Sequence, residues 1–499
     1  MKTKIFLSFM LSAVLAVSCT NLDEELYSTV PDGSFGTTPA EVQALVGGAY
    51  SSLRGFSDEI TTSFPTTEVF FINEVSSDEA TIPTRGVNWY DGGRYQEMQR
   101  HDWTPQNPLV FSVWRYAYNG IAKVNSIIYQ IDKSALSTKE KEPIYAELKA
   151  VRSYYYLLLL DIFGNVPIVT DFADLTLPTN SSRAEVFNFV EKELNDALPH
   201  LKSGVVYSKF TKNVAYSLLA RLYLNAEVYT GKARWADALK AAQSVQGHSL
   251  NGDYFGNFLV ENQNSPEIIL SIPFDSKAGT VGNYIGSMSF HYLHRFTIAA
   301  NGDYPWCANG ISAQPGVYSA FSEDDKRRKS LAIGDQISLA TGSTIVMDNG
   351  EPLTYTENIT SLASAKENEG ARINKYEQKP GEKYERDHDW VLVRYAEMLM
   401  IQAECHVRMG NPSLAKPLMD QVLARTGTKA PDNITLDYLN EELMKEFIFE
   451  GQRRTTNIRF GTFFKPWWEK GATEAYRNIF PIPSTVLITN TNLKQNPGY

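Results

Sequence analysis

Apolar side chains recur every three or four positions over much of the chain, which is the spacing of one buried face of an α-helix. The first such segment runs from Pro39 to Leu53, where Thr38 is placed to cap the helix and Pro39 occupies its first position. The pattern therefore predicts a mostly helical protein. The same period recurs at 109–131, 144–163, 183–198, 213–230, 235–245, 390–409, 413–425 and 436–450.

Two long stretches lack this period. Residues 55–108 are rich in Gly, Pro, Thr, Asp and aromatic side chains, and residues 250–385 are rich in Gly, Asn, Ser and Tyr, with short strand-like runs such as 267–272. Irregular stretches of this length inside a compact chain are usually functional or disordered. Their aromatic content argues against disorder, so we expect a loop-rich lobe beside the helices.

Two of the predicted helix pairs match each other in spacing. Small residues at such positions let antiparallel helices approach closely, as they do in tetratricopeptide repeats. We interpret the pairs as divergent tetratricopeptide-like units, and the alternative is two coincidental helix hairpins. A scaffold of this kind leaves the long insertions to carry the functional site. The matched positions are Ala226-Glu227 with Ala403-Glu404, Ala238 with Ala415, and Val245 with Val422.

The N-terminus carries an export signal. Two lysines precede an apolar run from Ile5 to Val17, which is too short to span the ~30 Å hydrocarbon core of a membrane. Such a run is typical of a signal peptide. Small residues then precede Cys19 as in a bacterial lipobox, so we interpret 1–18 as a lipoprotein signal peptide and Cys19 as the lipidated residue. Ordinary signal cleavage that leaves Cys19 unmodified is the alternative.

Composition and charge narrow the class of partner. The chain has 499 residues, of which 43% are hydrophobic and 21% are charged, as in ordinary globular proteins. Its formal charge of −10 would become −12 without the signal peptide, because 45 basic residues would then face 57 acidic ones. A net negative charge of this size argues against nucleic acid as a partner, because phosphate groups bind basic surfaces. The aromatic content of 12% fits a neutral polar ligand instead.

No motif in the sequence indicates catalysis or a cofactor. Gly-x-Ser-x-Gly, His-Glu-x-x-His and phosphate-binding glycine loops do not occur. No pair among the 57 acidic residues stands out as a glycosidase pair. His291 and His294 have a spacing that suits a metal, but no third ligand follows at a fixed distance. The three cysteines are too few for a disulfide framework or a four-cysteine zinc site. We therefore expect no catalytic residues, no cofactor and no metal.

A loop in the first irregular stretch combines the side chains that sugar recognition needs. An aromatic ring can cover the C–H face of a sugar, and Trp89 and Tyr90 can supply that ring. Charged and amide groups bind hydroxyls strongly. Two alternatives stay open, because Trp89 could instead pack the loop onto the helices. Arg85 could likewise pair with Asp91 or Glu79. The polar candidates are Asp78, Arg85, Asn88 and Asp91.

A second candidate loop spans residues 288–318. It contains Tyr304 and Trp306, which could add aromatic surface to the same ligand site. Arg372 follows in the same irregular stretch and could reach the site from there. The alternative for Arg372 is a strand residue held in a salt bridge.

Several segments together resemble the SusD/RagB family of outer-membrane nutrient (glycan)-binding lipoproteins of Bacteroidetes. Each segment is weak alone, but they occur in the family's order over nearly the whole chain. The segments are the lipobox followed by Leu22-Asp23-Glu24, Val151–Tyr156 with Asp161–Pro167, Val393–Glu404, Glu446–Arg454, Phe480–Pro483 and Gln495–Tyr499.

The resemblance implies a mostly α (α+β) fold, in which four tetratricopeptide-like helix pairs pack against an irregular loop-rich lobe that carries the ligand. A lipid-anchored tether at 19–38 would connect the anchor to one SusD-like domain at 39–499. The scaffold would comprise mainly 109–245 and 386–460, and the ligand lobe mainly 55–108 and 250–385.

The resemblance also implies a function. A family member of this kind is a cell-surface lipoprotein of the outer membrane that binds oligo- or polysaccharide without catalysis. It acts as a lid that delivers the ligand to a SusC-type TonB-dependent transporter. The acidic stretch 22–25 resembles the surface-export signal of such lipoproteins, or else is a solvated linker. Three alternative functions are an assembly partner of the transporter with little binding of its own, a binder of another nutrient such as peptide, and a secreted glycan hydrolase.

Overall fold

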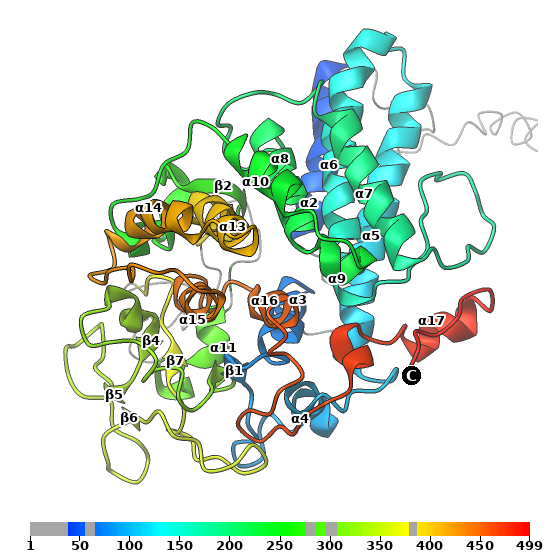
Figure 1. Ribbon diagram of the computed structural model, residues 1–499. Coiled ribbons are helices and arrows are strands. Elements are labelled where there is room, and N and C mark those ends of the chain that lie inside the picture. Colours follow the sequence, from blue (N-terminus) through cyan, green and yellow to red (C-terminus); the bar gives the residue numbers. More distant parts are fainter. Residues whose placement is uncertain (1–37, 55–64, 276–282, 284, 295–306, 379–386) are drawn as a thin grey trace, which may run out of the picture.

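The computed structural model describes residues 38–54, 65–275, 283, 285–294, 307–378 and 387–499. Helices dominate the described residues, and one half of the molecule consists almost entirely of them (Figure 1). This confirms the mostly helical class predicted from the sequence. The helices of this half are α2 (Pro39–Leu53), α5 (Pro108–Lys133), α6 (Thr138–Ile162), α7 (Arg183–Ala197), α8 (Lys212–Leu224), α9 (Ala226–Thr230), α10 (Trp235–Gln243), α13 (Tyr395–Arg408) and α14 (Pro412–Leu423).

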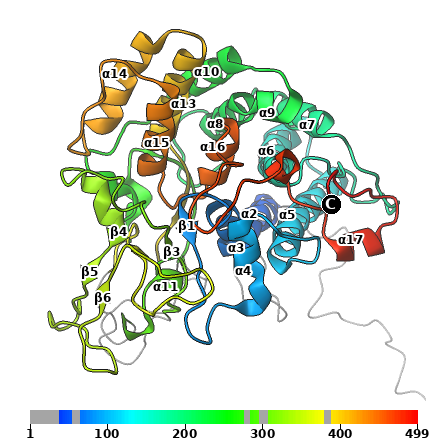
Figure 2. The same cartoon turned by 60° about the horizontal axis from the view of Figure 1, so that its bottom comes forward.

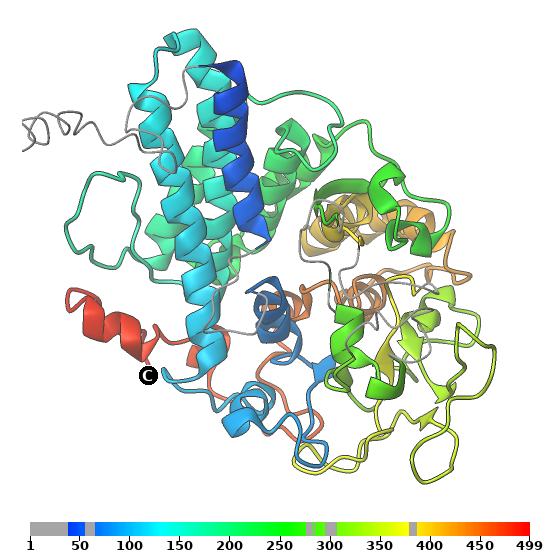
Figure 3. The same cartoon turned by 180° about the vertical axis from the view of Figure 1, so that it is seen from behind.

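The helices of the scaffold pack in neighbouring pairs, α2 with α5, α6 with α7, α8 with α10 and α13 with α14. Figure 3 shows α2 lying along α5 and α6 on the far side of the molecule. One close approach depends on a glycine, because a Cβ atom on Gly120 of α5 would stand 2.1 Å from the Tyr155 ring of α6. At this position the Tyr155 ring can lie against α5 only because residue 120 has no side chain.

The start of α2 shows why the first helix could be predicted from the sequence. The Thr38 backbone N–H donates to Glu41 Oε2 at 2.9 Å, and the Glu41 N–H donates to Thr38 Oγ1 at 3.3 Å. This reciprocal capping box satisfies two of the free N–H groups at the helix end. The observed bounds, Pro39–Leu53, are those that the sequence predicts.

The other half of the molecule is built from short strands, turns and small helices. Figure 2 shows α3 and α4 between the helical half and the strands β5 and β6. All paired strands are antiparallel. The strand pairs are β1 (Ala80–Thr81) with β3 (Ser312–Ala313), β2 (Ile268–Ile272) with β8 (Trp390–Arg394), β4 (Leu331–Ala332) with β7 (Arg372–Ile373), and β5 (Gly334–Asp335) with β6 (Thr354–Tyr355). The remaining helices are α3 (Pro65–Glu74), α4 (Arg94–Arg100), α11 (Ile285–Ser289), α15 (Leu436–Glu446), α16 (Arg453–Arg459) and α17 (Ser484–Thr489).

The structure corrects the type of element in two places, and it divides the helix expected over 213–230 into α8 and α9 at Asn225. The helix expected over 390–409 begins only at Tyr395, because Trp390–Arg394 form strand β8 against β2. Both faces of this short apolar run are largely buried, so its period cannot distinguish strand from helix. The stretch 55–108, expected to be irregular, contains α3 and α4.

One large hydrophobic core extends through both halves of the molecule, and a smaller core lies among α13, α14 and α15. Buried ion pairs also connect the halves, with Glu446 of α15 contacting Arg327, Arg394 and Arg425. Cys307 and Cys405 are both buried. Within the described ranges, no helix combines the length and apolar character needed to cross a membrane.

Candidate functional site

The loop that contains Trp89 and Tyr90 is tied to a distant part of the chain. Arg85 and Asn88 exchange two backbone hydrogen bonds of 3.0 Å across a tight turn. The Thr84 N–H donates to the Leu362 carbonyl at 2.9 Å, and the Ala365 N–H donates to the Thr84 carbonyl at 2.9 Å. Residues 83–93, hereafter the aromatic loop, are therefore held at their base by backbone pairing.

The Trp89 side chain is held in place by contacts with Ala308 and Gly310. Its indole Nε1–H donates to the Ala308 carbonyl at 2.6 Å. The half-buried indole lies on Gly310, and its ring centroid is 5.5 Å from that of Tyr95. The sequence left open whether this residue binds ligand or packs the loop. The structure shows packing onto 307–310, with part of the side chain still exposed.

Tyr90 is the exposed aromatic residue of the loop, with 60% of its surface accessible. Asp91 follows it and lies 3.5 Å from Arg94 at the surface. The backbone φ angles of Trp89 and Asp91 are +66° and +44°. A positive φ is an outlier for a bulky side chain and costs on the order of 1–3 kcal/mol. Strain of this kind persists only where the surroundings impose it, and it is frequent at binding sites.

The two candidate arginines lie beneath the loops. Arg85 donates to the Lys366 carbonyl at 2.6 Å and to Ser312 Oγ at 3.2 Å, and it pairs with neither Asp91 nor Glu79. Burial lowers the pKa of the Arg85 guanidinium well below its usual range, and the neighbouring positive charge adds to this effect.

Arg372 is fully buried in β7. Its guanidinium donates to Asn309 Oδ1 at 2.8 Å and to the Glu367 carbonyl at 2.7 Å, and it lies 4.7 Å above the Tyr355 ring. No salt bridge holds it among the described residues. Arg85 and Arg372 have 2% and 0% of their surface accessible, and both donate to backbone carbonyls beneath the loops; contact of either with ligand stays a prediction.

Asp78 lies between the first candidate loop and α16. Its carboxylate receives hydrogen bonds from Arg453 at 2.6 and 2.9 Å and from Asn457 at 2.8 Å. Burial raises the pKa of Asp78, but the Arg453 guanidinium and these hydrogen bonds outweigh burial, so the pKa lies below its usual range. The side chain is therefore anchored to α16, with 29% of its surface still accessible.

The second candidate loop is described only in part. Tyr304 and Trp306 lie outside the described residues, and their role stays a prediction. His291 Nε2 is 3.3 Å from Glu367 Oε2. Burial lowers the pKa of His291 to about 4 and that of His294 to about 3, so both rings are neutral at pH 7. No group of three potential metal-ligating side chains occurs in the parts of the chain that the structure describes.

The sequence did not predict how the aromatic loop is supported. Asn309 has a φ of +54° and accepts the Arg372 hydrogen bond, and Lys366 accepts from Arg85 through its carbonyl. Asn309 lies in the second candidate loop, but its contact with Arg372 was not predicted. Nothing in the sequence around Lys366 predicts its contact with a residue so far along the chain.

The fold and the site together define a helical-repeat scaffold that presents a rigid, aromatic surface loop. The chain belongs to the SusD family, whose sequence profile matches residues 228–499. A second profile, described as starch-binding and associating with the outer membrane, matches residues 67–224.

Relatives with known names cover the chain from end to end. It is 25% identical to the starch-binding protein SusD of Bacteroides thetaiotaomicron over 100% of both chains. It is 23% identical to the SusD-like protein P2 of Formosa agariphila, over 99% of this chain and 100% of that one.

Solved structures show the same fold. A laminarin-binding SusD-like protein superposes with a TM-score of 0.75 at 22% identity, over 93% of this chain and 100% of the other. The surface glycan-binding protein A of Bacteroides thetaiotaomicron, in complex with laminarihexaose, gives a TM-score of 0.74 at 21% identity, over 92% and 100%.

Proposed function

We propose that this protein is a cell-surface lipoprotein that binds oligo- or polysaccharide without catalysis. Three of the relatives named above are described as starch-binding, laminarin-binding or glycan-binding, and none of the four as an enzyme. The observation that carries the proposal is the exposed ring of Tyr90 beside the clamped indole of Trp89.

The geometry supports binding by a preorganised surface. An exposed aromatic ring covers the C–H face of a sugar ring, and the carboxylate of Asp91, which follows Tyr90, accepts hydrogen bonds from its hydroxyls. That carboxylate is exposed, with 44% of its side-chain surface accessible. Because the loop is fixed before ligand arrives, little conformational entropy is lost on binding.

Isothermal titration of the protein without its signal peptide tests the proposal, with laminarihexaose and maltohexaose as first probes. We expect one of them, or another glycan of a plant, microbial and host panel, to bind. Tyr90→Ala should weaken that binding at least tenfold. Phe172→Ala is the matched control, because Phe172 is also an exposed aromatic residue, at 47%, but lies outside the aromatic loop.

Two results would count against a glycan site at the loop. If no glycan of the panel binds, a peptide ligand or an assembly role is favoured. Peptide binding is then tested by the same titration. Glycan binding that survives Tyr90→Ala unchanged would move the site elsewhere. Release of shortened products by the pure protein would support the hydrolase alternative.

The proposal places the protein at the outer membrane, anchored through Cys19 by a tether at 19–38. Cys19 lies outside the described residues, and the support is the lipobox together with the profile that associates residues 67–224 with the outer membrane. Cys19→Ala should release the protein from the membrane fraction and abolish labelling by radioactive palmitate. Retention of both would contradict lipidation at this residue.

The proposal names a SusC-type TonB-dependent transporter as the partner, with this protein acting as its lid. Family membership supports it. Affinity purification of the full chain from solubilised outer membranes should recover a large transporter in equal amounts from wild type and Tyr90→Ala. A pure glycan-binding role predicts no such partner, and an assembly role predicts the partner without glycan affinity.

A further inference from the structure

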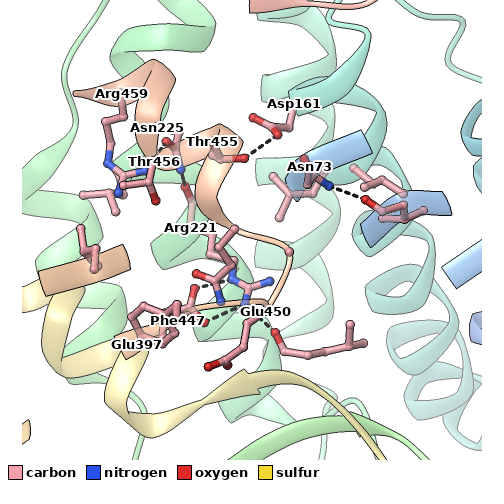
Figure 4. A pocket seen from close by; sticks show the side chains of 18 of the residues that line it. Asn73, Asp161, Arg221, Asn225, Glu397, Phe447, Glu450, Thr455, Thr456 and Arg459 are labelled. Carbon is pink, nitrogen blue, oxygen red and sulfur yellow. Dashed lines mark hydrogen bonds and ion pairs between the residues drawn. The ribbon is translucent and has the colours of Figure 1, made fainter. Parts of the chain in front are cut away.

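The charged groups that line the cavity between the scaffold and the C-terminal helices are paired within the protein. The cavity has a volume of about 170 Å³ (Figure 4). Arg221 Nη2 is 2.7 Å from Glu397 Oε2, and Thr455 Oγ1 donates to Asp161 at 2.7 Å. Apolar surface without such internal partners lies instead on the outside of the scaffold, where the loop 164–182 meets α17.

Three large apolar side chains of this loop, and one of α17, are exposed to solvent. Leu175 has 91% of its surface accessible, and Ile488 has 77%. Residues 170–177 are exposed without interruption. Exposed apolar side chains that occur together mark interaction sites on soluble proteins, whereas single ones do not. The apolar patch consists of Phe172, Leu175, Leu177 and Ile488.

Hydrogen bonds hold the two segments of the patch together. Asn490, which follows the last residue of α17, donates through Nδ2 to the Pro178 carbonyl at 2.9 Å. Asn492 donates through Nδ2 to the Leu177 carbonyl at 2.8 Å. Figures 1 and 3 show the loop beside α17 at one edge of the scaffold. The exposed side chains of the loop and of α17 therefore belong to one surface.

The loop is fixed in place although its side chains are exposed. Near its start, the Val169 N–H donates to the Tyr156 hydroxyl at 2.7 Å. The Phe172 ring centroid lies 5.6 Å from that of Tyr129 in α5. The two asparagines described above hold its far end. A surface that is ordered before a partner arrives loses little conformational entropy on docking.

Two carboxylates accompany the apolar side chains. Asp171 Oδ1 accepts the Ala173 N–H at 2.8 Å, and Asp174 Oδ1 accepts the Thr176 N–H at 2.9 Å. Both aspartates are exposed. Residues 164–182 contain no lysine or arginine. The loop therefore presents an apolar surface with a negative charge at its edge.

This charge distinguishes the surfaces that could cover the patch. A symmetric dimer brings the same patch of two copies face to face, so Asp171 and Asp174 would meet their own counterparts. An anionic lipid surface would repel them as well, and the chain as a whole carries a formal charge of −10. A protein cleft that is apolar inside and basic at its rim complements both features.

We infer that the apolar patch, with Asp171 and Asp174 beside it, docks into an apolar cleft with a basic rim on the SusC-type transporter. The inference rests on the transporter proposed above as the partner, and it adds the surface through which the two proteins meet. The patch shares no residue with the aromatic loop.

Affinity purification of the full chain from solubilised outer membranes tests the inference, with the recovered transporter quantified by mass spectrometry. Leu177→Lys places a positive charge against the basic rim, so recovery should fall about tenfold. Leu414→Lys in α14 is the matched control and should recover as much transporter as the wild type, because Leu177 and Leu414 are both 54% exposed.

Further variants separate lost docking from lost folding and test the charge. The melting temperature of Leu177→Lys should equal that of the wild type. Leu175→Lys, at the more exposed position, should give the same loss of recovery and is the second variant should Leu177→Lys fail to fold. Asp171→Asn combined with Asp174→Asn keeps both hydrogen-bond acceptors and removes both charges. It should weaken recovery severalfold, and equal recovery would overturn the basic rim.

The remaining outcomes distinguish a wrong surface from a wrong partner. If the wild type recovers no transporter, the proposed partner and the inference are both wrong. If wild type and Leu177→Lys recover it equally, the partner stands and the docking surface is wrong. A dimer of the protein without its signal peptide, dissociated by Leu177→Lys in sedimentation velocity, would assign the patch to a second copy. Flotation with vesicles of phosphatidylethanolamine and phosphatidylglycerol, lost in the same variant, would assign it to lipid.

Discussion

The indole ring of Trp89 lies directly on the backbone of Gly310. A Cβ atom at residue 310 would stand 2.3 Å from Cζ2 of the indole, closer than two carbon atoms can approach. The adjacent Ala308 carbonyl accepts the indole N–H at 2.6 Å. The glycine and the carbonyl together fix the ring that precedes the exposed Tyr90, although Trp89 and Ala308 are 219 residues apart in the sequence.

The first prediction concerns Gly310→Ala. The added methyl group would displace the Trp89 indole from the backbone at residue 310, so we expect glycan affinity to fall at least tenfold. The free energy of unfolding should fall by about 1–3 kcal/mol, as is usual for overpacking. Titration calorimetry and urea denaturation measure the two effects. Gly310 does not have a positive φ, so the loss is steric and not a backbone effect.

Gly47→Ala is the matched control for this substitution. Gly47 lies in α2, and a methyl group added there would meet nothing within 4 Å, so alanine should raise helix stability by up to about 1 kcal/mol. Its glycan affinity should equal that of the wild type. Unchanged affinity in Gly310→Ala would show that the position of Trp89 does not matter for binding.

Sequence reasoning succeeded where the determining contacts are local. The bounds of α2 follow from Thr38, Glu41 and the helical period, all within a few residues of one another. Strand β8 was missed because its pairing partner β2 lies more than a hundred residues away, and a buried apolar run shows no period of its own. Long-range pairing of this kind leaves no local signal.

The same limit applies to the candidate site. Tyr90 could be predicted to be exposed because glycines surround it, and Gly86, Gly92 and Gly93 do have positive φ. The burial of Arg372 could not be predicted, because its acceptors are mostly backbone carbonyls that any sequence supplies. A candidate charged residue in a loop therefore needs a structure before it is assigned to a ligand.

The second prediction concerns the ion pairs around Glu446. Arg394 and Arg425 contact Glu446 Oε1 at 2.6 and 2.7 Å, and Arg327 contacts Oε2 at 3.1 Å. Glu446→Gln removes the anion that these cations share, while each keeps another carboxylate partner, so the free energy of unfolding at pH 7 should fall by about 1.5–3 kcal/mol. Urea denaturation measures it. Glu441→Gln, on the exposed side of the same helix, should change stability little.

The third prediction is the pH dependence of this cluster. Burial raises the pKa of Glu446, but the three guanidinium groups outweigh it and lower the pKa to about 2. The ordinary pKa of 4.5 applies in the unfolded chain. The unfolded chain therefore binds the proton first, and stability is present above pH 4.5 and lost as the pH falls toward 2. The stability difference between Glu446→Gln and wild type should shrink over that range, and a constant difference would contradict the assignment.

The buried carboxyl groups of Glu74 and Glu79 have raised pKa values, in contrast to Glu446, whose pKa is lowered. Glu79 Oε1 accepts a hydrogen bond from the Phe449 N–H at 2.5 Å, and Glu74 Oε1 accepts one from the Gly451 N–H at 2.6 Å. The Oε2 atoms of both have no donor among the described residues. Burial raises the pKa of Glu74 to about 7. Burial and the charge of Glu74 raise the pKa of Glu79 well above its usual range. One proton shared between the two carboxyl groups satisfies both oxygens.

The fourth prediction follows from that shared proton. Glu74 releases its proton near pH 7 and Glu79 keeps the shared one to higher pH, whereas the glutamates of the unfolded chain release theirs near the ordinary pKa of 4.5. The dyad therefore stabilises the fold below pH 4.5, and its contribution is lost as the pH rises to about 7. Glu79→Gln gives Glu74 a hydrogen-bond donor that does not titrate. The melting temperature of this variant should therefore exceed that of the wild type at pH 8, and it should vary less between pH 5 and 8. Differential scanning calorimetry measures both, with the exposed Glu323→Gln as control. A wild-type slope preserved in Glu79→Gln would show that the proton is not held between these two residues.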